Sequence, residues 1–250
     1  MTDVGRVVAL GASNLTRGFQ TVVATARTAW GPDVEIVAAL GHGRSYGGPS
    51  QFLVRRLPGI LDSGLWRRLE SSPVTPTRGL VTDVGNDIVY GFSADRILSW
   101  VDDALARLGG VSDDLVLTDL PMDSIRHLSP RKFRATRAML FPSCRLSFAE
   151  VIDIAERVNA GLAELALARR ARLLHLEPAW YGFDPVHIRP SRWQEAWQAI
   201  LGVSCPVSRS RLETLRLYAK RPEQQWFCGL EQRTEQQGSR LPRGARVWLY

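Results

Sequence analysis

An aspartate and a histidine lie three residues apart in the segment Asp184-Pro-Val-His187. At this spacing both side chains can lie on one side of a single turn, so the carboxylate can fix the tautomer of the imidazole while the other ring nitrogen faces a nucleophile. Of the four histidines, only His187 has such a partner. We expect His175 inside a strand facing the core, His127 in a loop, and His42 beside a glycine-rich loop with no carboxylate close in sequence. The pair therefore predicts a general base held by an acid.

The segment Leu10-Gly-Ala-Ser13-Asn offers a nucleophile for that base. An apolar strand is expected to end there and a helix to begin, which would present the Ser13 hydroxyl at the N-terminus of the helix. Free backbone amides and the positive end of the helix dipole favour developing negative charge at that position. A Gly-x-Ser turn also commonly caps a helix, so this segment alone fits a cap as well as a nucleophile.

Two further turns carry groups that could bind an oxyanion. The loop Gly41-His-Gly43-Arg-Ser-Tyr-Gly47-Gly48 has four glycines in eight residues, which lets the backbone approach a ligand closely. A flexible loop is the alternative. The turn Asp83-Val-Gly-Asn86-Asp87 could hold the Asn86 amide as a donor, or it could be simple turn chemistry.

Short β-branched runs alternate with longer amphipathic stretches, and this pattern predicts a parallel sheet covered by helices. The expected strands are Arg6–Leu10, Val34–Leu40, Gly79–Val84, Asp114–Leu120 and Arg172–Leu176. The expected helices are Thr16–Trp30, Ser50–Leu69, Ala94–Leu108, Pro130–Leu140 and Phe148–Ala171. The predicted fold class is α/β, a three-layer α/β/α sandwich with about five parallel strands, whose ligands sit beyond the carboxyl ends of the strands.

Several helix boundaries have their own signals. Ser129-Pro130 predicts an N-cap followed by a proline in the first turn, and Gly109-Gly110 predicts the end of the third helix. The segments Ser147-Phe-Ala-Glu150 and Ser191-Arg-Trp-Gln194 both have the capping-box pattern, in which two side chains satisfy free backbone amides.

The alternation of strands and helices ends near residue 203. We therefore predict an α/β domain over residues 1–203 and a C-terminal extension over residues 204–250. The extension has a short helical stretch near Arg209–Ala219 and a strand pattern at Ala245–Tyr250. Its aromatic residues predict that it packs on the domain: Trp226, Phe227, Trp248 and Tyr250.

In this order, each after a predicted strand, the four polar segments resemble the motif blocks of the SGNH (GDSL-like) hydrolase superfamily. The resemblance runs from about residue 5 to residue 203 and leaves the extension uncovered. It implies a flavodoxin-like three-layer sandwich in which Ser13 is the nucleophile, while Asp184 and His187 complete a catalytic triad.

The same resemblance implies an oxyanion hole. Its donors would be the amide of the nucleophilic serine, the amide of Gly43 and the side chain of Asn86, with Gly41 the other glycine that fits. The chain departs from the family pattern at two positions. Ala12 stands where the family usually has Asp, and Val84 stands where it often has Gly.

The implied activity is that of a carboxylester hydrolase with an acyl-enzyme intermediate, acting on a small or medium ester such as an acetylated sugar. Thioesters, lysophospholipids and acyl transfer to an alcohol stay open. The alternative from another class is a non-catalytic anion- or carbohydrate-binding module on the same fold. The full Gly-x-Gly-x-x-Gly and P-loop signatures of nucleotide binding are absent. The nucleophile elbow of α/β-hydrolases needs glycine where Leu15 stands.

Three arginines, Arg17, Arg44 and Arg189, lie within four residues of the predicted nucleophile, glycine loop and base. If they face the cleft, the substrate carries a carboxylate, sulfate or phosphate, because guanidinium groups bind such anions through paired hydrogen bonds. The alternative is coincidence, since arginine makes up nearly all of the 32 basic residues. The aromatic residues Trp180, Tyr181 and Phe183 could line a pocket, although an anchor for the loop of the predicted acid and base is the favoured interpretation.

The formal charge is +7, but the arginines are scattered and no nucleic-acid-binding motif accompanies them. We therefore expect a solvated arginine-rich surface and no nucleic-acid partner. Cys144, Cys205 and Cys228 include no C-x-x-C pair, which disfavours a disulfide framework or a zinc knuckle. No set of ligands has metal spacing, so we expect neither metal nor cofactor.

The N-terminal residues lack the basic and apolar regions of a signal peptide. No stretch reaches the apolar run of about 20 residues that a membrane helix needs. We expect a soluble, cytoplasmic protein that acts on a small-molecule ester, and the sequence leaves its oligomeric state open.

Overall fold

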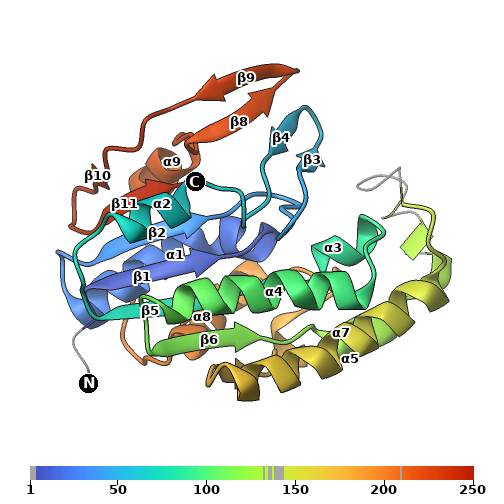
Figure 1. The fold of residues 1–250 in the computed structure, drawn as a ribbon. Coiled ribbons are helices and arrows are strands. Elements are labelled where there is room, and N and C mark those ends of the chain that lie inside the picture. The colour runs from blue at the N-terminus through green and yellow to red at the C-terminus, as the bar shows by residue number, and fades with distance from the viewer. Residues whose placement is uncertain (1–3, 132, 135–136, 138–143, 209) are drawn as a thin grey trace.

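A seven-stranded sheet forms the centre of the molecule (Figure 1). The computed structural model describes residues 4–131, 133–134, 137, 144–208 and 210–250. Within these residues the strands lie side by side in the order β10 (Ser239–Arg240), β11 (Arg246–Leu249), β2 (Glu35–Ala39), β1 (Arg6–Leu10), β5 (Thr77–Val81), β6 (Asp114–Thr118) and β7 (Arg172–Leu174). Neighbouring strands are parallel except β10 and β11, which are antiparallel.

A second, antiparallel sheet joins a hairpin at residues 50–57 to the C-terminal extension. Its strands have the order β3 (Ser50–Phe52), β4 (Arg55–Leu57), β8 (Gln224–Phe227) and β9 (Leu230–Arg233). The β3–β4 hairpin lies on the side of the molecule toward which the arrowheads of β1 and β2 point (Figure 1). This second sheet therefore stands near the edge of the main sheet at which ligands are expected.

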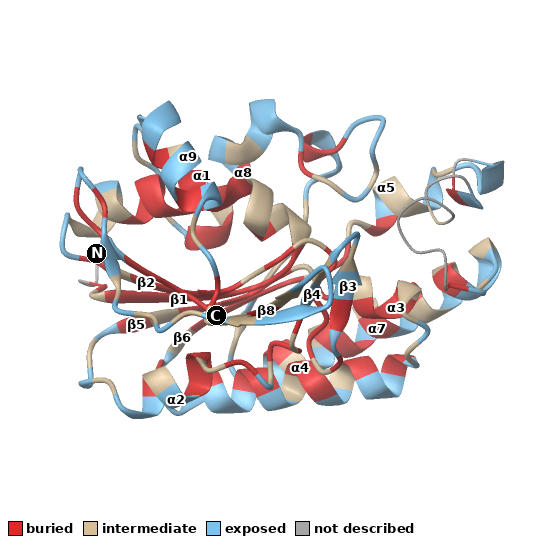
Figure 2. Cartoon of the chain, turned by 90° about the horizontal axis from the view of Figure 1, so that it is seen from above, coloured by how far each residue is buried: buried red, intermediate tan, exposed pale blue. Residues whose placement is uncertain are grey.

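Helices cover both faces of the central sheet and complete a three-layer α/β/α sandwich (Figure 2). One face is covered by α1 (Ser13–Trp30), α8 (Trp193–Leu201) and α9 (Arg211–Tyr218). The other face is covered by α2 (Leu65–Glu70), α4 (Ala94–Gly109) and α7 (Phe148–Ala168). Shorter helical segments lie in the connections: α3 (Asn86–Val89), α5 (Met122–Arg126), η1 (Pro178–Trp180) and η2 (Pro190–Arg192). The predicted fold class is confirmed.

The alternation of side chains along β1 shows how the two cores form. Val7 and Ala9 pack in the cluster that includes α1 and α8, whereas Val8 and Leu10 pack in the cluster that includes α4 and α7. Successive side chains of a strand point to opposite faces of the sheet. A strand covered on both faces is therefore apolar in nearly every position.

Two of the predicted boundary signals are confirmed. The Ser147 side chain accepts a hydrogen bond from the Glu150 backbone, and the Glu150 side chain accepts one from the Ser147 backbone, so α7 begins with a capping box. Helix α4 ends at Gly109, with Gly110 as its C-cap. The helix predicted over Pro130–Leu140 includes residues that lie outside the described residues.

The helix predicted over Ser50–Leu69 is wrong in its first half. A hairpin occupies that segment, with Leu53 in a left-handed turn conformation (φ 54°), and α2 begins only at Leu65. Pro58 and Gly59 follow the hairpin and oppose a continuous helix. In addition, β4 pairs with β8 from the far end of the chain. The residues around the hairpin do not indicate that β8 pairs with it, because β8 lies far away in the sequence.

Two smaller predictions are also wrong. Ser191 is not the cap of α8, because a 3-10 turn occupies Pro190–Arg192 and α8 begins at Trp193 without a side-chain cap. His175 does not face the core. It lies just beyond the end of β7, its side chain is 79% exposed, and its Nδ1 lies 2.8 Å from an oxygen of Asp119.

The last strand of the chain is part of the central sheet. Strand β11 pairs in parallel with β2, and the residues Val247, Trp248, Leu249 and Tyr250 are all buried. Residues of the C-terminal extension thus cover an edge of the sheet that β2 would otherwise leave unpaired.

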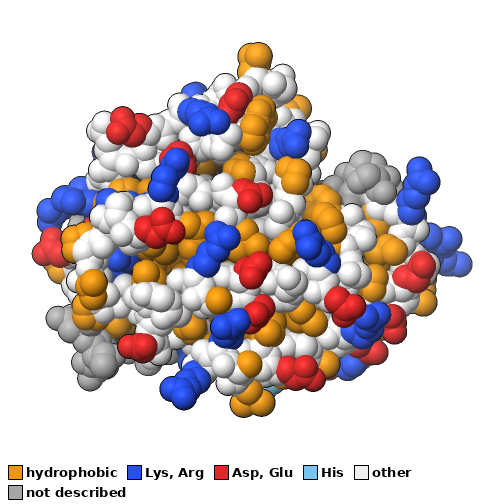
Figure 3. Space-filling model, viewed as in Figure 1, with side chains coloured by type: hydrophobic (Ala, Val, Ile, Leu, Met, Phe, Trp, Pro, Cys, Tyr) orange, Lys and Arg blue, Asp and Glu red, His pale blue; other side chains and the backbone are white. Residues whose placement is uncertain are grey.

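Basic and acidic side chains are interspersed on the face of the molecule seen in Figure 3. Several charged side chains form ion pairs, such as Arg169 with Asp102 and Arg126 with Glu156. Among the residues that the structure describes, no helix is both long enough and apolar enough to span a bilayer.

Candidate active site

Ser13 is the first residue of α1 and follows the turn that leaves β1. The residue before it, Ala12, has no side chain that could cap the helix. The carboxylate of Asp83 supplies the cap from the neighbouring loop, because one of its oxygens accepts hydrogen bonds from Ala12 N at 2.8 Å and from Leu15 N at 3.0 Å. A carboxylate at this position satisfies free amides and interacts favourably with the helix dipole. Asp83 therefore fixes the turn that presents Ser13.

Asp83 reaches this turn because its backbone is left-handed, with φ 60°. It follows β5, which ends at Val81, and aspartate is one of the few residues with a side chain that tolerates this conformation at modest cost. In the sequence, Asn86 was the predicted site residue of this segment, and Asp83 was missed. Ala12 was the available signal for Asp83. It stands where the family pattern has Asp, so the turn needs a carboxylate from another segment.

Ser13, His187 and Asp184 form one row of hydrogen bonds. The Ser13 hydroxyl lies 3.0 Å from His187 Nε2, although 174 positions separate the two residues. On the other side of the ring, His187 Nδ1 lies 2.7 Å from a carboxylate oxygen of Asp184. With its proton on Nδ1, the imidazole presents Nε2 as an acceptor for the hydroxyl proton. The structure thus brings together the three predicted catalytic side chains in an order that can activate a serine.

Asn14 ties the histidine loop to the start of α1. Its side-chain oxygen accepts a hydrogen bond from Ile188 N at 2.8 Å. Its side-chain nitrogen donates to Val186 C=O at 2.9 Å and to the Asp83 carboxylate at 2.9 Å. The two backbone groups flank His187, so one amide side chain fixes the imidazole relative to the serine hydroxyl. No sequence pattern indicated this role.

The carboxylate of Asp184 is held in its ionised form. The Asp184 side chain is 50% exposed, whereas that of His187 is 18% exposed. Partial burial acts to raise the pKa of Asp184, but the hydrogen bond and charge of His187, the Val186 amide and the charge of Arg17 together outweigh it. The pKa of Asp184 therefore lies below its ordinary value. At neutral pH this carboxylate is ionised and can hold the Nδ1 proton.

The glycine-rich loop after β2 is held by residues of the α3 segment. The Asp87 carboxylate accepts hydrogen bonds from Tyr46 N at 3.0 Å and from the Ser45 hydroxyl. The Tyr90 hydroxyl donates to Gly43 C=O at 2.7 Å. Gly43 itself has φ 65°, a conformation that favours glycine. Burial raises the pKa of Asp87 to about 6, despite its two hydrogen bonds.

Asn86 is the first residue of α3, and its side-chain nitrogen lies 3.4 Å from Asp83 C=O. Gly43 and Asn86 thus lie in the loops that follow β2 and β5, the two strands on either side of β1. The predicted oxyanion donors therefore come from loops that flank the serine turn. Gly41, the other candidate, is closely packed, because a Cβ there would lie 2.2 Å from the Leu57 side chain.

The prediction that Arg44 binds substrate is wrong. Its side chain is fully buried, and its guanidinium donates hydrogen bonds to the backbone carbonyls of Leu40, Pro58 and Tyr250. Burial, together with the nearby charge of Arg55, lowers the pKa of Arg44 to about 9, so it stays protonated at neutral pH. Arg44 joins three chain segments and cannot contact a ligand.

The other two predicted arginines lie near the site in different ways. Arg17 follows Ser13 by one helical turn, and its Nη1 lies 3.8 Å from a carboxylate oxygen of Asp184. Arg189 is turned across its own loop, where its Nη2 donates to Ala179 C=O at 2.5 Å. Arg17 therefore faces the row of Ser13, His187 and Asp184, while Arg189 braces the loop that carries Asp184 and His187.

The aromatic residues ahead of Asp184 divide between two roles. Trp180 and Tyr181 are buried, and the Trp180 indole donates to Glu195 at 3.0 Å, so these two anchor the loop. Phe183 is 84% exposed. Together with Tyr181 it lines a pocket of about 300 Å³ beside the loop.

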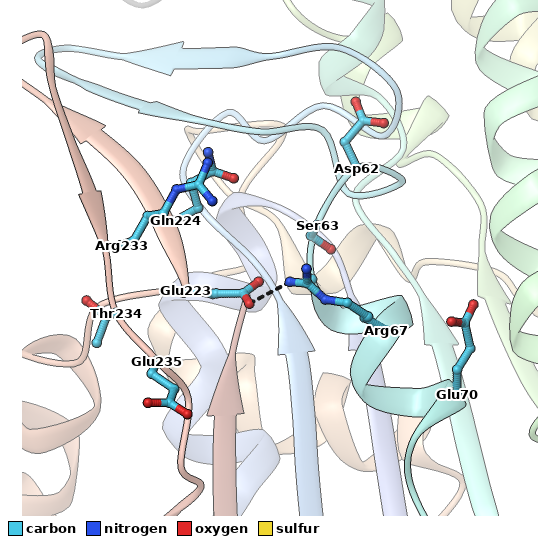
Figure 4. Close-up of a pocket in the computed structure, with 10 residues that line it drawn as sticks. Asp62, Ser63, Arg67, Glu70, Glu223, Gln224, Arg233, Thr234 and Glu235 are labelled. Carbon is cyan, nitrogen blue, oxygen red and sulfur yellow. Dashed lines mark hydrogen bonds and ion pairs between the residues drawn. The ribbon is translucent and has the colours of Figure 1, made fainter.

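A larger pocket of about 600 Å³ lies between α2 and the strands β8 and β9 (Figure 4). Its lining mixes both charges, and Arg67 and Glu223 pair across it at 2.9 Å. None of the three residues of the hydrogen-bonded row lines it. Across the described residues, no three His, Cys, Asp or Glu side chains converge as metal ligands would.

The chain matches no protein-family model and no curated protein sequence. Solved structures do match its fold. A carbohydrate acetylesterase from Sinorhizobium meliloti aligns with a TM-score of 0.53 at 12% identity, over 79% of this chain and 97% of that one. A member of the lipolytic protein G-D-S-L family from Veillonella parvula aligns with a TM-score of 0.50 at 13% identity, over 79% of this chain and 97% of that one. The fold is that of the SGNH (GDSL-like) hydrolases.

Proposed function

We propose that this chain is a serine hydrolase that cleaves carboxylic esters of small or medium size. The observation that carries the proposal is the row from Asp184 through His187 to Ser13, with separations of 2.7 and 3.0 Å. The row lies beyond the carboxyl ends of the parallel strands, where α/β sheets bind ligands. The esterases among the structures that share this fold support ester hydrolysis as the class of reaction.

In the first half of the reaction, His187 Nε2 takes the proton of Ser13 as Oγ attacks the ester carbonyl carbon. Asp184 stabilises the imidazolium that results. The negative charge that develops on the carbonyl oxygen is held by the backbone amides of Ser13 and Gly43 and by the side-chain amide of Asn86. Fixed donors of this kind stabilise the transition state because they are already oriented when the charge appears.

In the second half, the imidazolium gives its proton to the departing alcohol, and the acyl group remains as an ester on Ser13. Water then attacks the acyl carbon while His187 takes one of its protons. The carboxylic acid leaves, and the proton returns to the serine oxygen. An alcohol in place of water at this step would give acyl transfer, so assays should measure both products.

A binding module on the same fold is the other candidate. A binder has no use for a carboxylate that orients an imidazole toward a hydroxyl, and this chain holds those three groups within hydrogen-bonding distance. The intact row therefore favours catalysis.

Labelling with a fluorophosphonate probe tests the proposal, because such probes react with an activated serine. The wild-type protein should be labelled at Ser13, and Ser13→Ala should abolish the label. Ser71→Ala, at an exposed serine after α2, is the matched control and should be labelled as wild type is. A folded wild-type protein that takes no label, or a label that survives in Ser13→Ala, would show that the proposal is wrong.

A hydrolysis screen over acyl length, charge and alcohol then defines the substrate. Acetylated sugars belong in it, together with thioesters and lysophospholipids. Turnover of at least one oxygen ester that disappears in Ser13→Ala is the expected result.

A further inference from the structure

The β3–β4 hairpin places an arginine beside the glycine-rich loop. Phe52 and Arg55 lie directly opposite each other in its antiparallel register, so their side chains are on the same face. The Phe52 ring packs on the imidazole of His42, with 5.3 Å between ring centroids. His42 precedes Gly43, the proposed oxyanion glycine. Arg55 therefore lies at the wall of the site formed by this loop.

Arg55 has hydrogen-bonding capacity that the structure leaves unused. Its side chain is partly buried, and its Nε is fully buried without an acceptor among the described residues. The next residue, Arg56, is exposed and lies over the ring of Trp226, 5.5 Å from its centroid. Burying a guanidinium N–H without an acceptor costs free energy. The Arg55 guanidinium is therefore not saturated with hydrogen bonds by the described residues.

A second cation faces the same space from α1. Arg17 lies one turn beyond Ser13, with its Nη1 3.8 Å from Asp184, which is longer than a hydrogen bond. Its side chain is 32% exposed. The guanidinium is therefore near the reacting groups and still accessible to a ligand.

The carboxylates of the site are already engaged. Asp184 accepts hydrogen bonds from His187 and from Val186 N. Asp83 accepts hydrogen bonds from two backbone amides of the serine turn and from Asn14. Neither carboxylate is paired with Arg55, so the positive charge of the hairpin is not neutralised by these groups.

His42 lies among these cations. Burial lowers the pKa of its imidazole, and the charges of His187, Arg17 and Arg55 lower it further, while Asp83 acts in the opposite direction. The imidazole is therefore neutral at neutral pH. Arg17 and Arg55 are thus both close enough to His42 to act on its charge.

We infer that Arg55, with Arg17 across the site, binds an anionic group of the ester substrate, and that this group is a carboxylate. Two parallel N–H groups of a guanidinium match the two oxygens of a carboxylate. The inference rests on the proposed hydrolase function. Arg55, which is partly accessible, thus replaces the buried Arg44 as the arginine expected to bind substrate.

Two matched pairs of esters test the inference. One pair, mono-4-nitrophenyl adipate and 4-nitrophenyl hexanoate, places the charge on the acyl side. The other, 4-acetoxybenzoate and its methyl ester, places it on the alcohol side. The measured quantity is kcat/KM for the anionic ester divided by kcat/KM for its neutral partner. In Arg55→Gln this ratio should fall by ~10-fold or more in one of the pairs, as loss of a charge-assisted hydrogen bond predicts.

Arg56→Gln is the matched control, because it removes an exposed arginine from the adjacent position of the same strand. Its ratio should stay within about twofold of wild type, as expected of a solvated charge. Inhibition of neutral-ester hydrolysis by benzoate, compared with benzamide, tests the same site in wild type and does not depend on whether Arg55→Gln folds. Benzoate should inhibit more strongly, and high salt should weaken it.

The two proposals fail in different ways. A protein that takes no fluorophosphonate label and hydrolyses no ester lacks the proposed function, and the inference falls with it. A protein that is labelled and hydrolyses neutral esters, but shows equal losses for charged and neutral esters in Arg55→Gln and equal inhibition by benzoate and benzamide, is a hydrolase without this anion site.

Discussion

Two polar side chains outside the row of Ser13, His187 and Asp184 hold its serine and its histidine in place. Asp83 caps the turn that carries Ser13, and Asn14 holds the backbone on both sides of His187. Because Asn14 also donates to Asp83, the turn and the loop are parts of one network. At the residue scale, the position of the Ser13 hydroxyl therefore depends on side chains that do not contact it.

Replacing Asn14 with alanine should lower kcat by about 10- to 100-fold and change KM little, because misplacing a catalytic group by a fraction of an ångström slows the chemical step. Steady-state kinetics on the best ester from the screen give both constants. Gln51→Ala, an exposed amide on the hairpin, should leave kcat unchanged. Asn14 is not a positioning residue if Asn14→Ala keeps the wild-type kcat. The same conclusion holds if urea unfolding shows that the fraction of unfolded protein accounts for the whole decrease in kcat.

At the scale of elements, α3 and the glycine-rich loop are joined by a buried carboxylate. Asp87 lies at 0% exposure and accepts hydrogen bonds from Ser45 and Tyr46 in that loop. Burial raises its pKa to about 6. The folded protein therefore holds this proton more tightly than the unfolded chain does.

This difference predicts a pH dependence of stability. Unfolded aspartate titrates near pH 4, so between about pH 4 and pH 6 the folded state binds more protons than the unfolded state, and the free energy of unfolding falls as pH rises. The fall due to Asp87 should be at most about 3 kcal/mol. Urea unfolding across this range should show it in wild type.

Two variants isolate the contribution of Asp87. Asp87→Asn cannot titrate and should lack this part of the fall, while Asp62→Asn, at an exposed aspartate, should follow the wild-type curve. If the free energy of unfolding changes with pH in the same way in wild type and in Asp87→Asn, the pKa of Asp87 is not raised in the folded protein.

On the scale of the whole molecule, the C-terminal extension is part of both sheets. The C-terminal extension supplies β11 to the central sheet and β8 and β9 to the smaller one. The indole of Trp248 is buried against the sheet and lies under the guanidinium of Arg68, 4.5 Å from the ring centroid. The extension is thus part of the structure that holds the β3–β4 hairpin over the candidate site.

Trp248→Ala should lower the free energy of unfolding by about 3–5 kcal/mol, because it leaves a cavity where a large buried ring was. Urea unfolding followed by circular dichroism measures the change. Leu230→Ala, at a β9 side chain that is 71% exposed, should change it by less than about 0.5 kcal/mol. Equal and small effects of the two substitutions would show that the extension contributes little to the stability of the fold.

The layered fold and the three residues of the hydrogen-bonded row could be predicted from the sequence. The strands of the central sheet read as short apolar runs because both of their faces are covered, and that property is local. Asp184 and His187 could be predicted together because three positions along one turn bring their side chains together. Ser13 could be predicted because a strand-to-helix turn places a hydroxyl at a helix N-terminus.

Which other side chains reach the site could be seen only in the folded protein. Arg44 and Arg55 are the same residue type near the same loop, yet Arg44 is fully buried and donates to three backbone carbonyls, whereas Arg55 is only partly buried. Asp83 serves a turn that belongs to another strand, and the hairpin exists because a distant strand pairs with it. The surroundings of a side chain depend on which remote segments pack around it, and a local stretch of sequence does not contain those segments.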